Sequence, residues 1–249
     1  MRTKEDFLNG QLLLIDKPLG WSSFQAVNKL KHAIRKADNL KKIKIGHAGT
    51  LDPLATGLLV ICTGKFTKRI NEIQAAEKEY TGVITLGATT PCYDLEKEVN
   101  EAFPTDHITE ELIQQTAKSF LGEQEQVAPI HSAKKIDGKR AYEYAREGEE
   151  VVIKSNTIDI KEFEVEVCEF EGNEILADSK INQEKPYQNG IHVQFRIVCS
   201  KGTYIRAIAR DFGEKLNSGG YLSKLVRTKI GDFNVVDAIT IDEVGSLFD

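Results

Sequence analysis

A short apolar run, GLLVICT at positions 57–63, limits the possible folds more than any other feature of this sequence. An uninterrupted run of this length is typical of a strand with two buried faces, so it predicts a central sheet with packed elements on both sides. Two later segments, 161–170 and 191–200, alternate apolar and polar residues, as strands with one buried face do. The segments 11–16 and 79–90 are also strand-like.

Helical periodicity appears in three segments. The first has inward positions predicted at Phe24, Val27, Leu30 and Ile34, after a cap at Ser22 or Ser23. The second, 108–122, begins with a cap near Thr109 and ends at Gly122, and the third covers 201–216. Strands outnumber helices and do not alternate strictly with them, so the sequence predicts an α+β fold with a mixed sheet rather than a doubly wound one.

Two polar segments interrupt these elements. Residues 123–150 contain a cationic cluster and an Asp137-Gly138 turn, which predict a loop with a hairpin or short helix. The polar stretch 179–190 predicts a hairpin tip.

The charge of the chain is unevenly distributed. A formal net charge of -5 argues mildly against a nucleic-acid partner, because affinity for phosphates comes from Lys and Arg. Acidic residues crowd two segments, whereas basic residues gather at 29–44, 64–69, 133–140 and 221–229. Local basic faces on an acidic protein are therefore expected.

The sequence predicts a cytoplasmic, reduced protein. Its charged N-terminus lacks the apolar region of a signal peptide, and no apolar run approaches the roughly 20 residues that cross a bilayer. The four cysteines, Cys62, Cys92, Cys168 and Cys199, form no C-x-x-C pair and are expected to be reduced and mostly buried.

Asp52 is the main candidate for chemistry. It lies between Leu51 and Pro53 in GHAGTLDPLATG (46–57), a segment with almost no other charge. The competing interpretation is structural, because an Asp before Pro in a glycine-bearing loop usually caps a turn.

Other catalytic classes find little support. The five histidines show no metal-ligand spacing, and no nucleotide-binding or serine-hydrolase motif is present, so neither a metal nor a cofactor is expected. Cys92 could attack a pyrimidine as a thiolate, but the sequence lacks the glycine-rich loop for a methyl donor, which favours a structural cysteine.

Five motifs together give the chain a resemblance to a known family. They are LLLIDKPLGWSS (12–23), GHAGTLDPLATGLLVICTGKFTK (46–68), HSAKKIDGKRAYEYAREG (131–148), CSKGTYIRAIARDFGEKL (199–216) and GGYLSKLVRTKIG (219–231). In this order they resemble the bacterial tRNA pseudouridine-55 synthase family, often called TruB. The resemblance implies the pseudouridine-synthase fold, a mostly antiparallel mixed sheet flanked by helices, and a cofactor-free isomerase.

The resemblance assigns the essential catalytic role to Asp52. In the family, this aspartate either attacks the ribose or base or removes the C2′ proton to give a glycal. The reacting uridine must be flipped out of its stack, and aromatic faces hold such bases well. Tyr80 matches the tyrosine that stacks on the flipped base, although without the family it is an amphipathic strand-end residue. Arg206 matches the arginine that pairs with the aspartate.

Further positions match the family's substrate pocket. Tyr204 and Leu225 match its lining, although core packing explains Leu225 equally well. His47 matches a histidine that fills or braces the site of the flipped base. Lys17 is expected to support Asp52 or a phosphate, with a solvated turn lysine as the alternative.

Residues 123–150 correspond to the family's inserted thumb. Its cations are expected to contact the RNA backbone of the T arm without reading sequence; they are Lys134, Lys135, Lys139 and Arg140.

The chain also departs from the family pattern. Val226 replaces a frequent arginine, His131 replaces an aromatic residue, and the polar stretch at 180–190 resembles an extension. Only a few residues follow the last motif, so we expect one catalytic domain over 1–249 without a C-terminal PUA-like RNA-binding domain.

The expected partner is tRNA, bound by a monomer without a membrane or an obligatory protein partner. Two alternatives stay open. One is a role in tRNA folding that accompanies catalysis, and the other is a relative that a guide RNA directs to its target.

Overall fold

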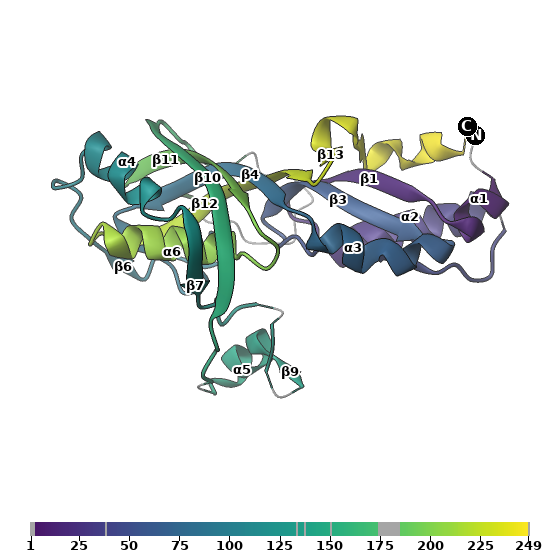
Figure 1. The fold of residues 1–249 in the computed structure, drawn as a ribbon, viewed down its shortest axis with the longest axis horizontal. Helices are drawn as coiled ribbons and strands as arrows, with labels where there is room; N and C mark the ends of the chain where they lie inside the picture. The colour runs from purple at the N-terminus through teal and green to yellow at the C-terminus, as the bar shows by residue number, and fades with distance from the viewer. Residues whose placement is uncertain are drawn as a thin grey trace. The chain divides into compact units, whose positions relative to one another are not determined.

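The computed structural model describes residues 3–37, 39–132, 134–136, 138–149, 151–173 and 185–248. The chain divides into two compact units. Unit 1 holds residues 1–80, 175–181 and 225–249, and unit 2 holds 81–174 and 182–224. The boundary falls within two strands, β4 (Lys78–Leu86) and β12 (Gly220–Ile230), so each of them contributes residues to both units (Figure 1).

Unit 1 is built on β3, the strand that the apolar run predicts. The strands wholly within this unit are β1 (Leu12–Lys17), β2 (Ile45–His47), β3 (Ala55–Thr63), β13 (Phe233–Asn234) and β14 (Ile239–Thr240). β3 pairs antiparallel with β1 and β2 and parallel with the end of β12. Gly57 illustrates its central position, because it lies opposite Lys17 on β1 and opposite Arg227 on β12.

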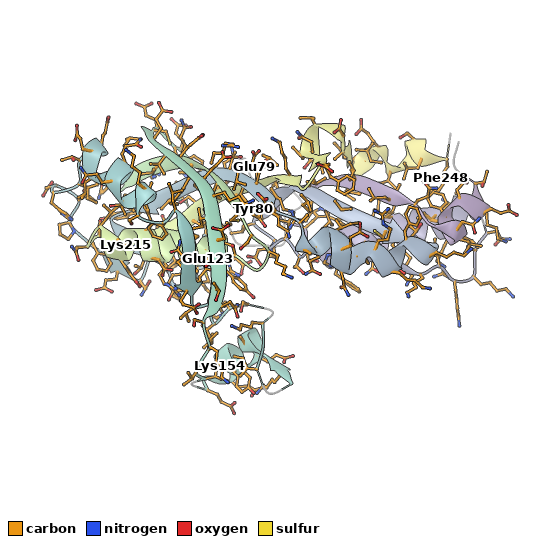
Figure 2. The ribbon with its side chains drawn as sticks, in the orientation of Figure 1. Glu79, Tyr80, Glu123, Lys154, Lys215 and Phe248 are labelled. Carbon is orange, nitrogen blue, oxygen red and sulfur yellow. The ribbon has the colours of Figure 1, made fainter. Side chains whose placement is uncertain are left out.

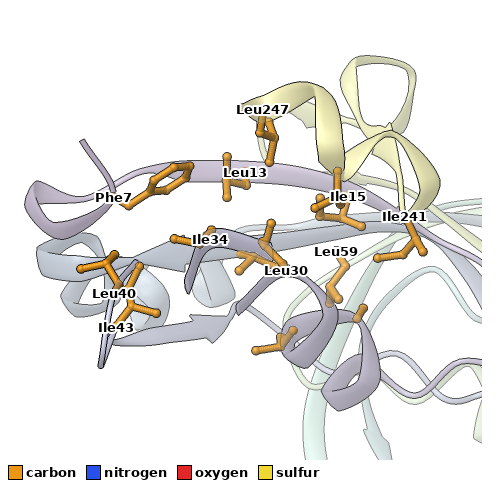
Figure 3. Packing of buried hydrophobic residues seen from close by; sticks show 14 residues of the cluster. Phe7, Leu13, Ile15, Leu30, Ile34, Leu40, Ile43, Leu59, Ile241 and Leu247 are labelled. Atoms are coloured by element: carbon orange, nitrogen blue, oxygen red, sulfur yellow. The ribbon is translucent and has the colours of Figure 1, made fainter. Parts of the chain in front are cut away.

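Both faces of β3 are covered, which confirms the prediction from its sequence. The helical segments of unit 1 are α1 (Lys4–Asn9), α2 (Ser23–Ala37), η1 (Gly64–Arg69), α3 (Ile70–Ala75), η2 (Val235–Asp237) and η3 (Asp242–Leu247). Leu59 and Ile61 belong to a cluster with residues of α2 and the C-terminal segment (Figure 3). Leu58 and Val60 belong to a second cluster, which includes Ile73 of α3. Successive side chains of a strand point to opposite faces, so the two clusters lie on the two sides of the sheet.

The predicted inward face of α2 is correct except at its first position. Val27, Leu30 and Ile34 are buried, whereas Phe24 is 70% exposed. Successive residues of a helix are about 100° apart around its axis. The buried side of α2 near Val27 is occupied by Ser23 and Ala26, so Phe24 points away from the core.

Unit 2 holds antiparallel strand pairs and three helices among the described residues. Its strands are β5 (Ala88–Thr89), β6 (Glu101–Ala102), β7 (Gly122–Gln126), β8 (Lys135–Ile136), β9 (Lys139–Arg140), β10 (Asn156–Cys168) and β11 (Ile191–Cys199). Its helices are α4 (Glu110–Lys118), α5 (Ala141–Glu147) and α6 (Ile205–Lys215). The long strand β10 pairs antiparallel with β11 on one side and with β7 on the other.

Aromatic side chains form the centre of unit 2. Phe163 of β10 contacts the rings of Phe120, Phe195 and Phe212 at centroid distances of 5.6–6.3 Å. Edge-on and tilted ring pairs of this kind add to the free energy gained by burial. Because Phe120 follows α4 and Phe212 lies on α6, the cluster attaches both helices to the sheet.

The structure differs from the sequence prediction at three places. The helix predicted over 201–216 begins later, at Ile205, and ends at Lys215. The helix predicted to end at Gly122 ends at Lys118, and Gly122 instead begins β7 with a φ of +88°. Residues 220–230 form a strand that the sequence pattern did not predict. Part of the predicted hairpin tip, 179–184, lies outside the described residues.

The fold class is confirmed. Helices pack on a mixed sheet, in which β1 pairs parallel with β14 and β3 with β12, whereas β3 pairs antiparallel with β1 and β10 with β11. All four cysteines are free, and three of them are buried. Among the described helices, none is both long enough and apolar enough to cross a membrane.

Candidate active site

The loop that carries Asp52, here called the Asp52 loop, covers residues 48–54 between β2 and β3. Asp52 is partly exposed, whereas the preceding Leu51 is 4% exposed. The Ser23 hydroxyl accepts a hydrogen bond from the Leu51 N–H at 2.8 Å and donates one to the Leu51 carbonyl at 3.1 Å. The first residue of α2 thus fixes the chain on one side of Asp52.

The chain is also fixed on the other side of Asp52. The carbonyl of Pro53 accepts hydrogen bonds from the Gly20 N–H at 2.9 Å and from the Lys17 ammonium at 3.4 Å. The Ala55 N–H donates to the Asp52 carbonyl at 3.1 Å and closes a turn. Asp52 therefore lies in a backbone turn, as the structural interpretation of its sequence predicted. In addition, hydrogen bonds from distant segments hold the residues on both sides of it, Leu51 and Pro53.

Lys17 is fully buried, so the alternative of a solvated turn lysine is wrong. Its ammonium donates to the carbonyls of Trp21 at 2.5 Å and Pro18 at 3.0 Å, in addition to Pro53. Burial lowers the pKa of Lys17 to about 7; the charge of Asp52 opposes this shift and that of Arg227 adds to it. Lys17 therefore braces the backbone beside Asp52 from within the core.

Arg227 of β12 is a second buried cation at this loop, and its role was not found from sequence. Its side chain is 1% exposed and donates to the carbonyls of Leu58 at 2.8 Å, Gly49 at 3.1 Å and Thr50 at 3.5 Å. The forked guanidinium thus joins the Asp52 loop to β3. An arginine among the apolar residues of a strand could have indicated this buried role. The sequence pattern did not predict β12, so the indication was missed.

The glycines at the two ends of the TLDPLAT sequence, Gly49 and Gly57, both have left-handed backbone. Gly57 has a φ of +95°, and a Cβ there would lie 2.4 Å from the Arg227 carbonyl oxygen. Gly49 has a φ of +97°, and a Cβ there would lie 3.5 Å from Nη1 of Arg227. Left-handed backbone explains both glycines, and limited space is a second reason at Gly57 only, because 3.5 Å is an ordinary contact distance.

His47 lies at the end of β2, opposite Ile61 of β3. Its Nδ1 is buried and has no hydrogen-bond partner among the described residues. Burial lowers the pKa of His47; the backbone of Gly49 opposes this shift, and the charge of Arg227 adds to it. The imidazole is therefore neutral at pH 7, and the recognition role of His47 stays a prediction.

Tyr80 and Leu225 are the last two predicted positions in unit 1. Tyr80 is 9% exposed, and it follows Glu79 on β4 (Figure 2). Leu225 is also 9% exposed and lies opposite Ala55, which follows the Asp52 loop. Both alternatives for Leu225, core packing and pocket lining, agree with this position.

Arg206 lies on α6 in unit 2, where several partners hold it. Its guanidinium donates to the carbonyls of Cys92 at 3.0 Å and His131 at 2.9 Å, and its Nε lies 3.5 Å from a carboxylate oxygen of Asp94. Asp94 was not predicted from sequence. Because Asp52 belongs to unit 1, the predicted Asp52–Arg206 pair stays a prediction.

Cys92 is not a nucleophile in this arrangement. Its thiol donates to a carboxylate oxygen of Asp94 at 2.9 Å. Burial and the negative charge of Asp94 raise the pKa of Cys92 to about 12, so the reactive thiolate is disfavoured. The structure favours the structural interpretation.

Tyr204 precedes α6 in unit 2. Its N–H donates to the Gln126 side chain at 2.8 Å, and the Gln126 amide donates to the Tyr204 carbonyl at 3.2 Å. These bonds fix the backbone of Tyr204 to the end of β7.

The thumb, residues 123–150, contains β7, the β8–β9 hairpin and α5, which agrees with the predicted hairpin or short helix. Lys134 donates to the Lys154 carbonyl, labelled in Figure 2, and to the Asn156 side chain at 3.0 Å. Lys139 pairs with Glu147 and, at 3.5 Å, with Glu149. The side chains of Lys135 and Arg140 lie outside the described part of the structure.

Known proteins resemble this chain in both sequence and fold. Residues 35–205 match the model of the TruB family pseudouridylate synthase (N terminal domain). A tRNA pseudouridine synthase B from Flavobacterium johnsoniae is 56% identical over 96% of both chains. The protein of that name from Bacteroides thetaiotaomicron is 48% identical over 94% of this chain and 91% of its own.

Two solved structures share the fold over nearly the whole chain. A chain in the crystal structure of a Cbf5-Nop10-Gar1 complex gives a TM-score of 0.64 at 26% identity, covering 98% of this chain and 55% of its own. A chain in an H/ACA RNP bound to a substrate RNA gives 0.60 at 25% identity, covering 96% of this chain and 53% of its own. This chain therefore spans about half the length of those two.

The fold class is that of the pseudouridine synthases. The chain belongs to the TruB family of pseudouridylate synthases and is an isomerase.

Proposed function

We propose that this synthase isomerises the T-loop uridine at position 55 of tRNA, with Asp52 as the essential catalytic group. The full-length relatives named tRNA pseudouridine synthase B support tRNA as the substrate. The observation that carries the role of Asp52 is its setting, a partly exposed carboxylate whose two chain neighbours are both held by bonds from other segments. Such preorganisation is what a reacting carboxylate needs.

The chemistry requires only groups that the chain supplies. The bond between N1 and C1′ breaks, the base rotates, and a bond between C5 and C1′ forms while the C5 proton leaves and N1 gains one. A carboxylate can attack carbon as a nucleophile or remove the C2′ proton, and both routes for Asp52 stay open. A bond from the carboxylate to C1′ would parallel the glycosyl-enzyme of retaining glycosidases.

The other predicted residues receive supporting roles. Tyr80 stacks on the flipped base, and Tyr204 and Leu225 line its pocket. His47 braces the place that the base leaves, and Arg206 orients the carboxylate. The anchoring of Arg206 by Asp94 and two carbonyls supports this role, because a fixed guanidinium offers its remaining surface in a defined direction.

The thumb holds the RNA backbone of the T arm in this proposal. Lys134 and Lys139 already bond to groups of unit 2, so binding of phosphates competes with these internal partners. Partner exchange of this kind is typical of surfaces that rearrange when RNA binds.

Turnover of an unmodified T-arm stem-loop tests the proposal. The purified chain is expected to convert one uridine into a product of equal mass that reacts with carbodiimide. Asp52→Asn should lower the rate on the order of 10⁴-fold or more while RNA binding persists. Asp232→Asn, at an exposed aspartate of unit 1, is the matched control and should retain the wild-type rate. Binding without any change of uridine by the wild type would contradict the proposal.

The same assay addresses the need for partners. One solved relative is a chain of an H/ACA RNP and the other a chain of a Cbf5-Nop10-Gar1 complex, whereas the tRNA pseudouridine synthase B relatives match this chain nearly end to end. We therefore propose a monomeric enzyme of the cytoplasm that needs no protein partner or guide RNA. Conversion that appears only after a guide RNA is added would favour the guide-directed alternative.

An accompanying role in tRNA folding belongs to the same proposal, because flipping of the base opens the RNA locally. Asp52→Asn separates the two activities. Faster refolding of unmodified tRNA in the presence of this variant would support the folding role, and loss of both activities would restrict the protein to chemistry.

A further inference from the structure

Phe24 is the only exposed aromatic side chain among those that the structure describes. It is 70% exposed, although the spacing of apolar residues in α2 predicted an inward position. A phenyl ring left in water contributes little to the core, so the Phe24 ring is available to contact a partner.

Phe24 follows a residue that is bonded to the Asp52 loop. The preceding residue, Ser23, exchanges two hydrogen bonds with the backbone of Leu51, which adjoins Asp52. The first turn of α2 therefore packs against the Asp52 loop within unit 1. Phe24 is on that turn, and its side chain faces solvent.

A polar and cationic row continues from Phe24 along the same side of α2. At about 100° per residue, Asn28, Lys31 and Arg35 fall within roughly 40° of Phe24 around the helix axis. Arg35 also holds the residue that follows the helix, because its Nε donates to the Leu40 carbonyl at 3.2 Å and its carbonyl accepts the Leu40 N–H at 3.0 Å. Lys41 therefore follows at the far end of this row. We call these five residues the α2 outer face.

The charge of this segment is opposite to that of the whole chain. Residues 29–44 contain seven Lys or Arg and one Asp, although the formal net charge of the protein is -5. Lys41 is exposed, Lys31 is partly exposed, and neither forms a salt bridge within the described residues. Lys139 of the thumb, by contrast, pairs with two glutamates. The cations of the α2 outer face are thus available to an external anion.

We propose that the α2 outer face binds the substrate tRNA from the T loop outward, to the part that lies beyond the T arm. Phe24 stacks on an unpaired base next to the flipped uridine, and Lys31, Arg35 and Lys41 follow the phosphate backbone away from the Asp52 loop. The helix of 15 residues is about 22 Å long, so its far end meets RNA well beyond the flipped nucleotide. Stacking platforms combined with a cationic track are typical of proteins that hold single-stranded or looped RNA. This inference rests on the proposed function.

Equilibrium binding to full-length unmodified tRNA and to an isolated T-arm stem-loop tests the cationic track. Lys31→Gln/Lys41→Gln is expected to weaken binding of full-length tRNA about tenfold and to lower the salt slope of its affinity by about 1.5. The matched control is Lys97→Gln/Lys118→Gln, which removes the same charge from exposed positions of unit 2 and should leave the affinity unchanged. Equal affinity of wild type and Lys31→Gln/Lys41→Gln for full-length tRNA, or an equal loss with both RNAs, would overturn the proposal.

The stacking part needs its own variants. Phe24→Ala is expected to weaken binding of full-length tRNA roughly tenfold, and Phe24→Leu should weaken it nearly as much because a flat ring is lost in both. Phe24→Trp should retain the wild-type affinity. Val236→Ala, at a residue of unit 1 that is 80% exposed, controls for loss of an exposed apolar side chain. Wild-type affinity in Phe24→Ala would overturn this part.

The two proposals fail in different ways. If the wild-type chain binds tRNA through the α2 outer face but converts no uridine, only the proposed function fails. If the T-arm stem-loop is converted and the α2 variants bind full-length tRNA like the wild type, only this inference fails.

Discussion

The Asp52 loop and the thumb are both irregular segments, yet they are held in opposite ways. The Asp52 loop is braced by two buried cations, Lys17 and Arg227, which donate to backbone carbonyls. The thumb lysine Lys139 instead pairs with exposed glutamates, whose side chains are 52% and 57% accessible. A reacting carboxylate needs one fixed position, whereas a surface that grips RNA can exchange its partners.

Arg227→Ala is expected to have the largest effect in this comparison. It leaves three backbone carbonyls around the Asp52 loop without their donor and opens a cavity, so the free energy of unfolding should fall by about 3 kcal/mol or more. Turnover of T-arm RNA at a temperature where the variant stays folded should fall as well. Denaturant unfolding and a single-turnover assay measure the two effects.

Arg227→Lys is the informative companion to this variant. It keeps the positive charge but not the forked donors, so most of the loss should persist. If folded Arg227→Ala turns over T-arm RNA at the wild-type rate, the hydrogen bonds of Arg227 are not needed to position the Asp52 loop.

Two glycine substitutions compare the regions directly. Gly57→Ala places a Cβ 2.4 Å from a backbone oxygen at a φ of +95°, and should cost about 3 kcal/mol of stability. Gly138→Ala in the thumb has a similar φ of +87°, but its Cβ would meet nothing within 4 Å among the described residues. It should therefore cost only the backbone strain of about 1–2 kcal/mol. Thermal or denaturant unfolding measures both losses of stability. Equal losses in Gly57→Ala and Gly138→Ala would show that β3, beside the Asp52 loop, and the thumb do not differ in this respect.

Lys17→Met should change the pH dependence of stability. Below pH 7 the folded and unfolded chains both carry the Lys17 proton, whereas between about pH 7 and pH 10.5 only the unfolded chain keeps it. Because the unfolded state then binds more protons, this group makes the protein more stable as pH rises through that window. The free energy of unfolding of the wild type relative to Lys17→Met should rise by up to about 1.4 kcal/mol per pH unit. A difference that stays constant from pH 6 to pH 9 would contradict the assignment.

Lys139→Gln in the thumb is expected to have the smallest effect on stability. Its ion pairs are exposed, so the free energy of unfolding should change by less than about 1 kcal/mol. If the thumb binds phosphates, the salt slope for T-arm affinity should fall by about 0.7–0.9 in the same variant. An unchanged slope would remove Lys139 from the RNA contact.

Much of the fold could be predicted because the core pattern is local. The run at 57–63 predicted a strand buried on both sides, and the alternation at 191–200 predicted β11. Phe24 shows the limit, because its apolar character fits a helical period by spacing alone and only the neighbouring elements define the buried arc. β12 was missed because its lysines and arginines resembled a surface segment, whereas Arg227 is buried by its bonds to other strands.

The sequence by itself determined the family, the likeness of Asp52 to its catalytic aspartate, and the strands and helices whose periodicity is continuous. Only the tertiary structure decided that Lys17 is buried and that Arg227 holds the Asp52 loop. It also decided that Arg206 bonds to Asp94 and that Phe24 faces solvent. The physical reason is the range of the interactions. Periodicity acts between residues a few positions apart, whereas the burial and partners of a charged side chain depend on segments that the fold brings together.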